Sequence, residues 1–85
     1  MEIIVRKPTE GEIIYMQREL VWEGDCSEFD YHCDYNETYL LEKGQVTITY
    51  NGKTISFGAG DLVFVPKGLD CHWKITSPVK KYERW

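Results

Sequence analysis

The chain of 85 residues carries a formal net charge of −4 at pH 7, and 14% of its residues are aromatic. This length supports one hydrophobic core but not two, and large rings fill a small core efficiently. The negative charge and the lack of a basic cluster predict no nucleic-acid partner, and no apolar run approaches the ~20 residues of a membrane span. We therefore expect one domain over residues 1–85, with an N-terminal segment at 1–25 and a barrel at 26–85.

The cysteines and the first residues bear on the compartment. Three cysteines without a CxxC pair fit a reducing environment better than a disulfide framework. Met1 opens a charged, strand-like segment, whereas a signal peptide begins with a basic region followed by an apolar one. These observations predict a cytoplasmic protein without a signal peptide.

The N-terminal segment predicts one strand and one short helix. A β-branched run at 3–5 favours a strand. In the stretch 9–20, Thr9 and Glu12 have the spacing of a capping box, and apolar residues recur every three or four positions. A glycine within this stretch weakens the pattern, so we expect only one or two helical turns. Two residues that follow are expected in the core: Trp22 and Cys26.

From residue 26 onward the chain predicts short antiparallel strands separated by turns. Alternating apolar and polar side chains indicate strands with one buried face. Such strands are expected at 29–33, 37–42, 45–50, 53–57, 62–65, 69–75 and 79–85. Asn51-Gly52 predicts a type I′ hairpin, Lys43-Gly44 predicts a tight turn, and Pro78 is expected to break a strand. The succession predicts an all-β sandwich or small barrel.

Alternation also predicts which side chains point into the barrel. The expected interior set is Tyr31, Cys33, Glu37, Tyr39, Cys71 and Trp73. Glu37 stands out, because an ionised carboxylate in a dry interior needs a partner, a ligand or a raised pKa. It either marks a functional site or is a structural acid bonded to a tyrosine hydroxyl or to backbone. The aromatic members fill the core and would also shape a pocket for a small, partly polar molecule.

The interior cysteines allow two interpretations. With Glu37, thiolates of Cys33 and Cys71 would suit a divalent transition metal such as zinc or iron(II). Alternatively, both are small buried hydrophobes, because no tight ligand-spacing motif accompanies them. His32 and His72 alternate to the outer face and are expected in solvent, unless a bulge reverses the parity of His32 and makes it a ligand.

Two stretches of the chain resemble the motifs of the cupin family. Glu37 and Gly44 match the second half, E-x6-G, of the first motif, G-x5-H-x-H-x3–4-E-x6-G. Gly60, Pro66 and Gly68 match the start of the second motif, G-x5-P-x-G-x2-H-x3-N. The resemblance implies a cupin-like jelly-roll barrel of short antiparallel strands.

Further stretches are similar to one branch of that family. The resemblance extends over residues 26–85, and the sequences at 36–38, 68–73 and 78–82 are similar to the single-cupin branch typified by the cupin domain of ureidoglycine aminohydrolases. This resemblance implies amidohydrolase-type chemistry on a small nitrogenous substrate, with a divalent metal as cofactor.

Most of the family's metal ligands are replaced in this chain. Metal-binding cupins hold their ion with three histidines and the glutamate. With the shorter motif spacing, the first two histidines fall on Tyr31 and Cys33; with the longer spacing they fall on Asp30 and His32. The third falls on Cys71. A metal site is therefore not simply implied by the resemblance.

Three functions remain open. The first is a small-molecule-binding cupin whose interior pocket surrounds Glu37 and lacks the usual histidine ligands. The second is a metal-dependent enzyme of amidohydrolase type, and the third is a degenerate barrel with a structural or interaction role. Leu40 and the run 62–65, which is apolar on both faces, predict that one face of the barrel meets a second subunit in a homodimer.

Overall fold

Antiparallel strands make up most of the molecule. The computed structural model describes residues 1–85 and contains seven strands and one helix. In chain order the elements are β1 (Ile4–Arg6), α1 (Glu10–Met16), β2 (Leu20–Gly24), β3 (Ser27–His32), β4 (Glu37–Tyr50), β5 (Lys53–Gly58), β6 (Leu62–Val65) and β7 (Asp70–Arg84). The all-β class predicted from alternation and turns is confirmed.

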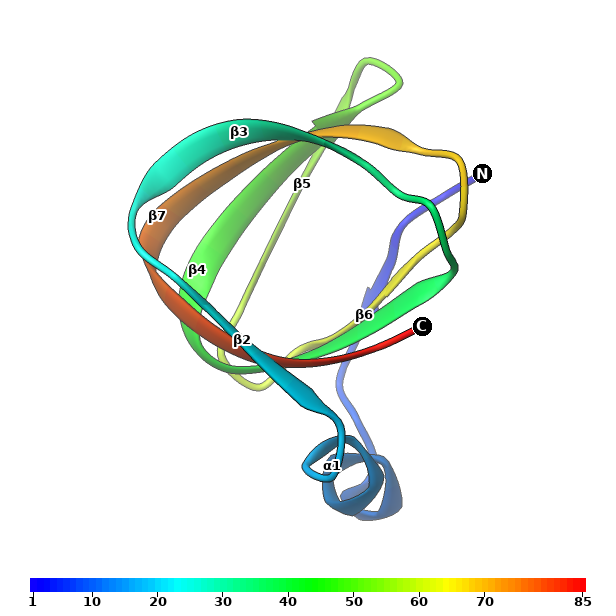
Figure 1. Ribbon diagram of the computed structural model, residues 1–85, viewed down its shortest axis with the longest axis vertical. Coiled ribbons are helices and arrows are strands. Elements are labelled where there is room, and N and C mark those ends of the chain that lie inside the picture. The colour runs from blue at the N-terminus through cyan, green and yellow to red at the C-terminus, as the bar shows by residue number, and fades with distance from the viewer.

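Two long strands, β4 and β7, form the frame of the fold (Figure 1). They pair with each other along most of their length. On its other edge β4 pairs first with β6 and then with β5, while β7 pairs first with β3 and then with β2. Strand β1 extends the sheet beyond β6. Because each long strand serves two sets of partners, the sheet bends over and closes into a jelly roll of the cupin kind.

The tight turn predicted at Lys43-Gly44 is instead a bend within β4. The pairing of β4 with β7 shifts register on both sides of Lys43, as at a β-bulge. Gly44 has φ +104°, and a Cβ there would lie 2.6 Å from the carbonyl oxygen of Pro78. Glycine is therefore required by both the backbone angle and the close crossing. The prediction was wrong because a bent strand and a hairpin carry the same glycine signal.

Pro78 does not end a strand either. It lies in β7 between the residues that pair with β3 and those that pair with β2, opposite the register shift of β4. Proline is tolerated at such an irregularity because no ladder hydrogen bond requires its missing N–H. The separate strand expected at 79–85 is thus the second half of β7.

The predicted hairpin and helix cap are confirmed. Asn51 and Gly52 have φ of 48° and 72°, as a type I′ turn requires. The Thr9 hydroxyl accepts a hydrogen bond from the Glu12 N–H, and the Glu12 carboxylate accepts one from the Thr9 N–H. The helix ends at Met16, so that it has the short length expected and the following residues lead into β2.

Helix α1 covers the sheet face that was expected to meet a second subunit. Met16 packs against Leu40 and Leu62, and all three side chains are buried. Phe64 and Tyr82 are partly buried at the border of this small cluster. The reason given for a homodimer, an uncovered apolar face, was therefore wrong, because the chain's own N-terminal segment supplies the cover.

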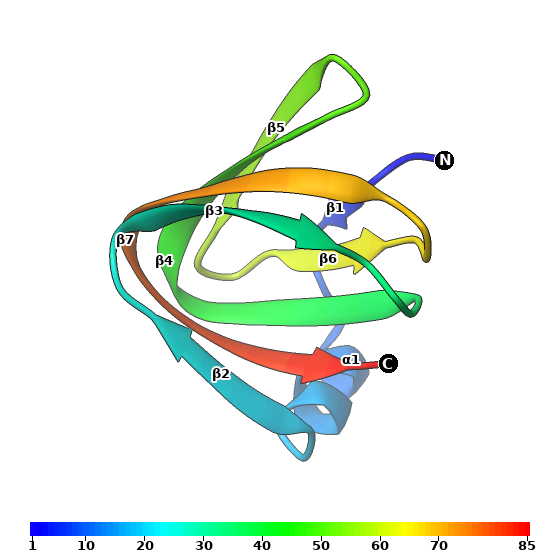
Figure 2. The ribbon, with the colours of Figure 1, turned by 45° about the horizontal axis from the view of Figure 1, so that its top comes forward.

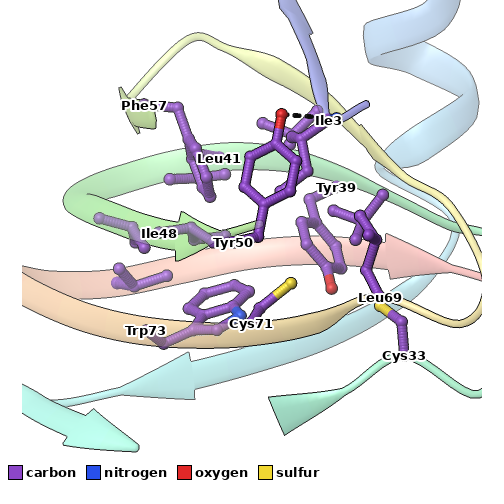
Figure 3. Packing of buried hydrophobic residues seen from close by; sticks show 14 of the residues in the cluster. Ile3, Cys33, Tyr39, Leu41, Ile48, Tyr50, Phe57, Leu69, Cys71 and Trp73 are labelled. Carbon is purple, nitrogen blue, oxygen red and sulfur yellow. Dashed lines mark hydrogen bonds between the residues drawn. The ribbon is translucent and has the colours of Figure 1, made fainter. Parts of the chain in front are cut away.

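The main hydrophobic cluster fills the interior of the jelly roll (Figure 3). Trp73 is central to it, with three ring centroids 5.7–6.0 Å away: those of Phe29, Tyr39 and Phe57. The Tyr50 hydroxyl accepts a hydrogen bond from the Ile3 N–H at 3.1 Å. This bond joins the N-terminal segment to the far end of β4.

Trp22 and Cys26, the two other residues predicted to lie in the core, differ in their burial. Trp22 packs against the main cluster but stays partly exposed. Cys26 is exposed, because it lies in the turn between β2 and β3, where strand parity no longer applies. No helix of the protein has the length and apolar character needed to cross a membrane.

Candidate functional site

A cavity of about 280 Å³ lies between β2 and β3, beside the main cluster. Figure 2 shows β3 above and β2 with the end of β7 below, and β4 and β7 complete the walls. The lining residues are Trp22, Phe29, Tyr31, Glu37, Tyr39, Trp73, Lys81 and Glu83. Five rings with a few converging polar groups are typical of a small-molecule site.

Glu37 is the buried carboxylate of this cavity and is only 4% exposed. Its Oε2 accepts hydrogen bonds from the Tyr31 hydroxyl at 2.5 Å and from the Cys33 thiol at 3.3 Å, and its Oε1 accepts one from the Tyr39 hydroxyl at 2.8 Å. All three partners are neutral donors, which matches an ionised carboxylate that can only accept. The acid is thus both bonded to tyrosines and part of a cavity wall.

The groups around Glu37 keep their protons at neutral pH. Burial raises the pKa of the Tyr39 hydroxyl well above its ordinary value, and the neighbouring Glu37 charge raises it further. The pKa values of Tyr31 and Cys33 are raised by burial and by their hydrogen bonds to Glu37. The pKa of Cys71 is raised by burial, then by the charges of Asp70 and Glu37.

These protonation states decide whether the metal of the cupin resemblance fits. A cysteine binds metal as the thiolate, which the raised pKa values of Cys33 and Cys71 oppose. No group of three or more His, Cys, Asp or Glu side chains is placed to hold an ion. The residues present do not fit a cupin metal centre.

Only some of the six predicted pocket residues line the cavity, and the others lie deeper in the protein. Four of them line the cavity: Tyr31, Glu37, Tyr39 and Trp73. Cys33 lies behind Glu37, fully buried, and its backbone is hydrogen-bonded to Gly68 and Leu69. Cys71 points into the main cluster (Figure 3). Strand parity predicted the correct side of the sheet for both cysteines but not that they would lie outside the cavity wall.

Lys81 is the site residue that the sequence analysis missed. It is 4% exposed, and its Nζ lies 3.8, 5.0 and 5.8 Å from the ring centroids of Tyr39, Trp22 and Trp73. Glu83 is its ion-pair partner at 3.4 Å. Burial lowers the pKa of Lys81, while the charges of Glu83 and Glu37 oppose that shift. Alternation continued from the buried Val79 would have placed Lys81 and Glu83 on the inner face.

Both histidines face outward, as the alternation predicts, and neither lines the cavity. His32 Nδ1 lies 2.6 Å from Asp70, and the two ring nitrogens of His72 lie 2.8 and 2.9 Å from Asp30 and Glu28. These contacts cross from β3 to β7. They hold two neighbouring strands together on the outer surface.

The fold and the inward-pointing glutamate of the E-x6-G motif define this protein as a cupin. Within that class, the chain belongs to the EutQ-like cupin family, whose model matches residues 15–82. The narrower resemblance to the ureidoglycine aminohydrolase branch stays a hypothesis, because these matches do not reach it.

Three known proteins that are similar to this chain illustrate its family. Acetate kinase EutQ of Escherichia coli K12 is 32% identical over 65 residues, which are 75% of this chain and 27% of that protein, so this chain spans about a quarter of it. A DUF861-family protein of Thermotoga maritima has a TM-score of 0.93 and 38% identity, covering 98% of both chains. The Clostridium difficile EutQ protein has a TM-score of 0.69 and 24% identity, covering 74% of this chain and 50% of that one.

Proposed function

We propose that this protein binds a small organic molecule in the cavity between β2 and β3, with Glu37 as the buried polar anchor. The observation that carries the proposal is the lining, in which five aromatic rings surround three charged side chains. The volume of about 280 Å³ is close to the lower end of the roughly 300–1,000 Å³ range of ligand pockets, which favours a small ligand. Glu37 and Lys81 are both buried, and charged side chains are rarely buried unless they are paired or belong to a functional site.

Catalysis is the less favoured function. Amidohydrolase-type chemistry on a small nitrogenous substrate would need a divalent ion, and the donors nearest Glu37 are two phenols and a protonated thiol. The acetate kinase activity named for the Escherichia coli relative belongs to a protein of which this chain spans 27%. Two carboxylates against one ammonium in the lining are also unfavourable to nucleotide phosphates.

The test is a ligand screen by NMR on ¹⁵N-labelled protein, using neutral, cationic and anionic compounds of low mass. Binding is expected to shift the indole N–H signals of Trp22 and Trp73, which line the cavity, and to leave that of Trp85 unchanged. Glu37→Gln should remove the binding while the protein stays folded. Glu42→Gln is the matched control, since it removes the same charge from a surface pair with Lys80.

The alternatives have distinct outcomes. A screen in which no compound shifts the cavity signals contradicts the binding function and favours a structural or interaction barrel. Elemental analysis of unheated, tag-free protein tests the metal-dependent enzyme. A stoichiometric divalent ion that is lost in Cys71→Ser would favour that enzyme over the binding function.

We also propose a cytoplasmic location. All three cysteines are free, and Cys26 is exposed. An exposed thiol persists in a reducing compartment but is oxidised more readily outside it. Fractionation of cells that express the chain from its own genomic locus tests this, and recovery outside the cytoplasm would contradict it.

A further inference from the structure

The charges that line the cavity do not cancel. Glu37 and Glu83 each contribute −1 and Lys81 contributes +1, so the lining carries a net charge of −1. Lys81 already has Glu83 as its ion-pair partner at 3.4 Å. Glu37 has hydrogen bonds from Tyr31, Tyr39 and Cys33 and no ion pair. The negative charge left without a cation is therefore that of Glu37, which is also buried from solvent.

The aromatic walls suit a positive charge as well. The ammonium of Lys81 lies over the Tyr39 ring, with Trp22 and Trp73 at longer distance. Ring faces attract cations through their negative quadrupole, most strongly where water is excluded. Phe29 and Tyr31 complete the ring lining of the cavity. An ammonium group on a ligand would meet the same kind of surface that already holds the protein's own ammonium.

The positive charge of Lys81 does not make the cavity favourable to an anionic ligand. When its amine is protonated, its charge is paired with Glu83 and the lining remains at −1. Burial lowers the pKa of Lys81, and the charges of Glu83 and Glu37 oppose that shift; with the amine neutral, the lining is at −2. In neither state does the cavity offer an unpaired cation to an anionic ligand.

We propose that the cavity takes a small organic cation, a protonated amine whose ammonium group pairs with the Glu37 carboxylate. This inference rests on the proposed binding function and names the charge class of its ligand. Such a ligand would give Glu37 a direct ion-pair partner, which Lys81 does not provide because it pairs with Glu83, and its carbon skeleton would pack against the rings. An anion would instead meet two carboxylates, and a neutral molecule would leave Glu37 without a counter-ion.

Three probes of equal carbon skeleton isolate the charge: n-butylammonium, 1-butanol and butyrate. Each is titrated into ¹⁵N-labelled protein at neutral pH, and the indole N–H signals of Trp22 and Trp73 are followed. We expect n-butylammonium to bind at least about tenfold more tightly than butyrate, a difference of about 1.4 kcal/mol. Tighter or equal binding of butyrate or butanol at these signals overturns the cation inference but leaves the binding function standing.

Two variants are expected to change the binding of n-butylammonium in opposite directions. Glu37→Gln should abolish the preference for n-butylammonium. Lys81→Met keeps an unbranched apolar side chain but removes the competing charge, so it should raise the affinity for n-butylammonium several-fold. Glu42→Gln should change neither. Because one variant predicts a gain, the inference stays testable even if Glu37→Gln does not fold.

The remaining outcomes are equally decisive. A cation preference that both Glu37→Gln and Lys81→Met leave unchanged overturns the assignment to Glu37. If none of the three probes shifts the cavity signals, the cation inference fails. The binding function itself fails only if the wider screen of neutral, cationic and anionic compounds is also blank.

Discussion

The two tyrosines that donate to Glu37 differ in exposure, which makes them a matched pair at the residue scale. Tyr39 is 1% exposed and is the only donor to Oε1, whereas Tyr31 is 37% exposed and shares Oε2 with Cys33. We expect Tyr39→Phe to lower the free energy of unfolding by about 1–3 kcal/mol, because it leaves a buried carboxylate oxygen without a donor. Tyr31→Phe should cost less, since Cys33 and water remain available.

Urea denaturation of both variants measures the difference between them. The phenyl ring is retained in each, so packing against Lys81 and Trp73 changes little. Losses of the same size in the two variants would contradict the view that burial of Oε1 makes the Tyr39 bond the more important one.

Residue positions could be predicted from the sequence where a strand is regular. Glu37 and Tyr39 lie at the start of β4, before its bulges, and parity placed both correctly. Parity assigns a side of the sheet but no depth, so it could not separate Cys71, in the main cluster, from Trp73, which reaches the cavity. Lys81 was missed because it follows the bend at Pro78, and because a buried lysine is rare.

At the scale of elements, β3 and β7 are joined on the outer face by histidine–acid contacts. The Asp70 carboxylate raises the pKa of His32, and Asp30 and then Glu28 raise that of His72, from an ordinary value of 6.5. A raised pKa in the folded state means that the stabilisation is fully present below 6.5 and is lost as pH rises through the folded-state pKa. We therefore expect the free energy of unfolding to decline as pH rises above 6.5, the ordinary histidine pKa.

The double variant His32→Gln, His72→Gln should flatten that decline. Stability measured by urea denaturation at alkaline pH should be nearly the same in the variant and the parent, because the histidines are neutral there. Measurements should stay above about pH 5, since Glu28, with its pKa lowered by His72, adds a loss of its own in acid. An unchanged slope in the double variant would assign the pH dependence to other groups.

The limits of sequence prediction at this scale come from two residues. Gly44 and Pro78 face each other where β4 and β7 cross the corner of the sheet. Each residue alone signals the end of a strand, and both signals were interpreted in that way. Only the pairing partner explains why neither ends one, because the bulge opposite Pro78 needs no N–H and the close crossing needs a glycine.

At the scale of the whole molecule, one chain is already compact. Its accessible surface is 5015 Å², close to the roughly 5,200 Å² expected of a folded monomer of its mass. With α1 covering the face formed by Leu40 and Leu62, size alone no longer requires a second subunit. A homodimer would therefore have to form through an exposed edge of the sheet.

Strand β2 offers such an edge. It is the last strand of the sheet on its side, so one edge of its backbone has no partner strand. Two consecutive apolar residues, Leu20 and Val21, are 59% and 52% exposed on it. Exposed apolar edge strands tend to pair with another chain, and natural proteins prevent this with charged residues such as lysine. We expect two copies to associate through β2 at high micromolar concentration.

Light scattering coupled to size exclusion tests this dimer, which should have twice the 10.0 kDa mass of the chain. Val21→Lys should return the protein to a monomer, because a charge at the edge opposes strand pairing there. Thr54→Lys, on an exposed position of β5, adds the same charge away from β2 and should leave the dimer intact. A parent chain that stays monomeric at high micromolar concentration would refute the dimer. A dimer that survives Val21→Lys would mean that the two copies meet through a surface other than β2.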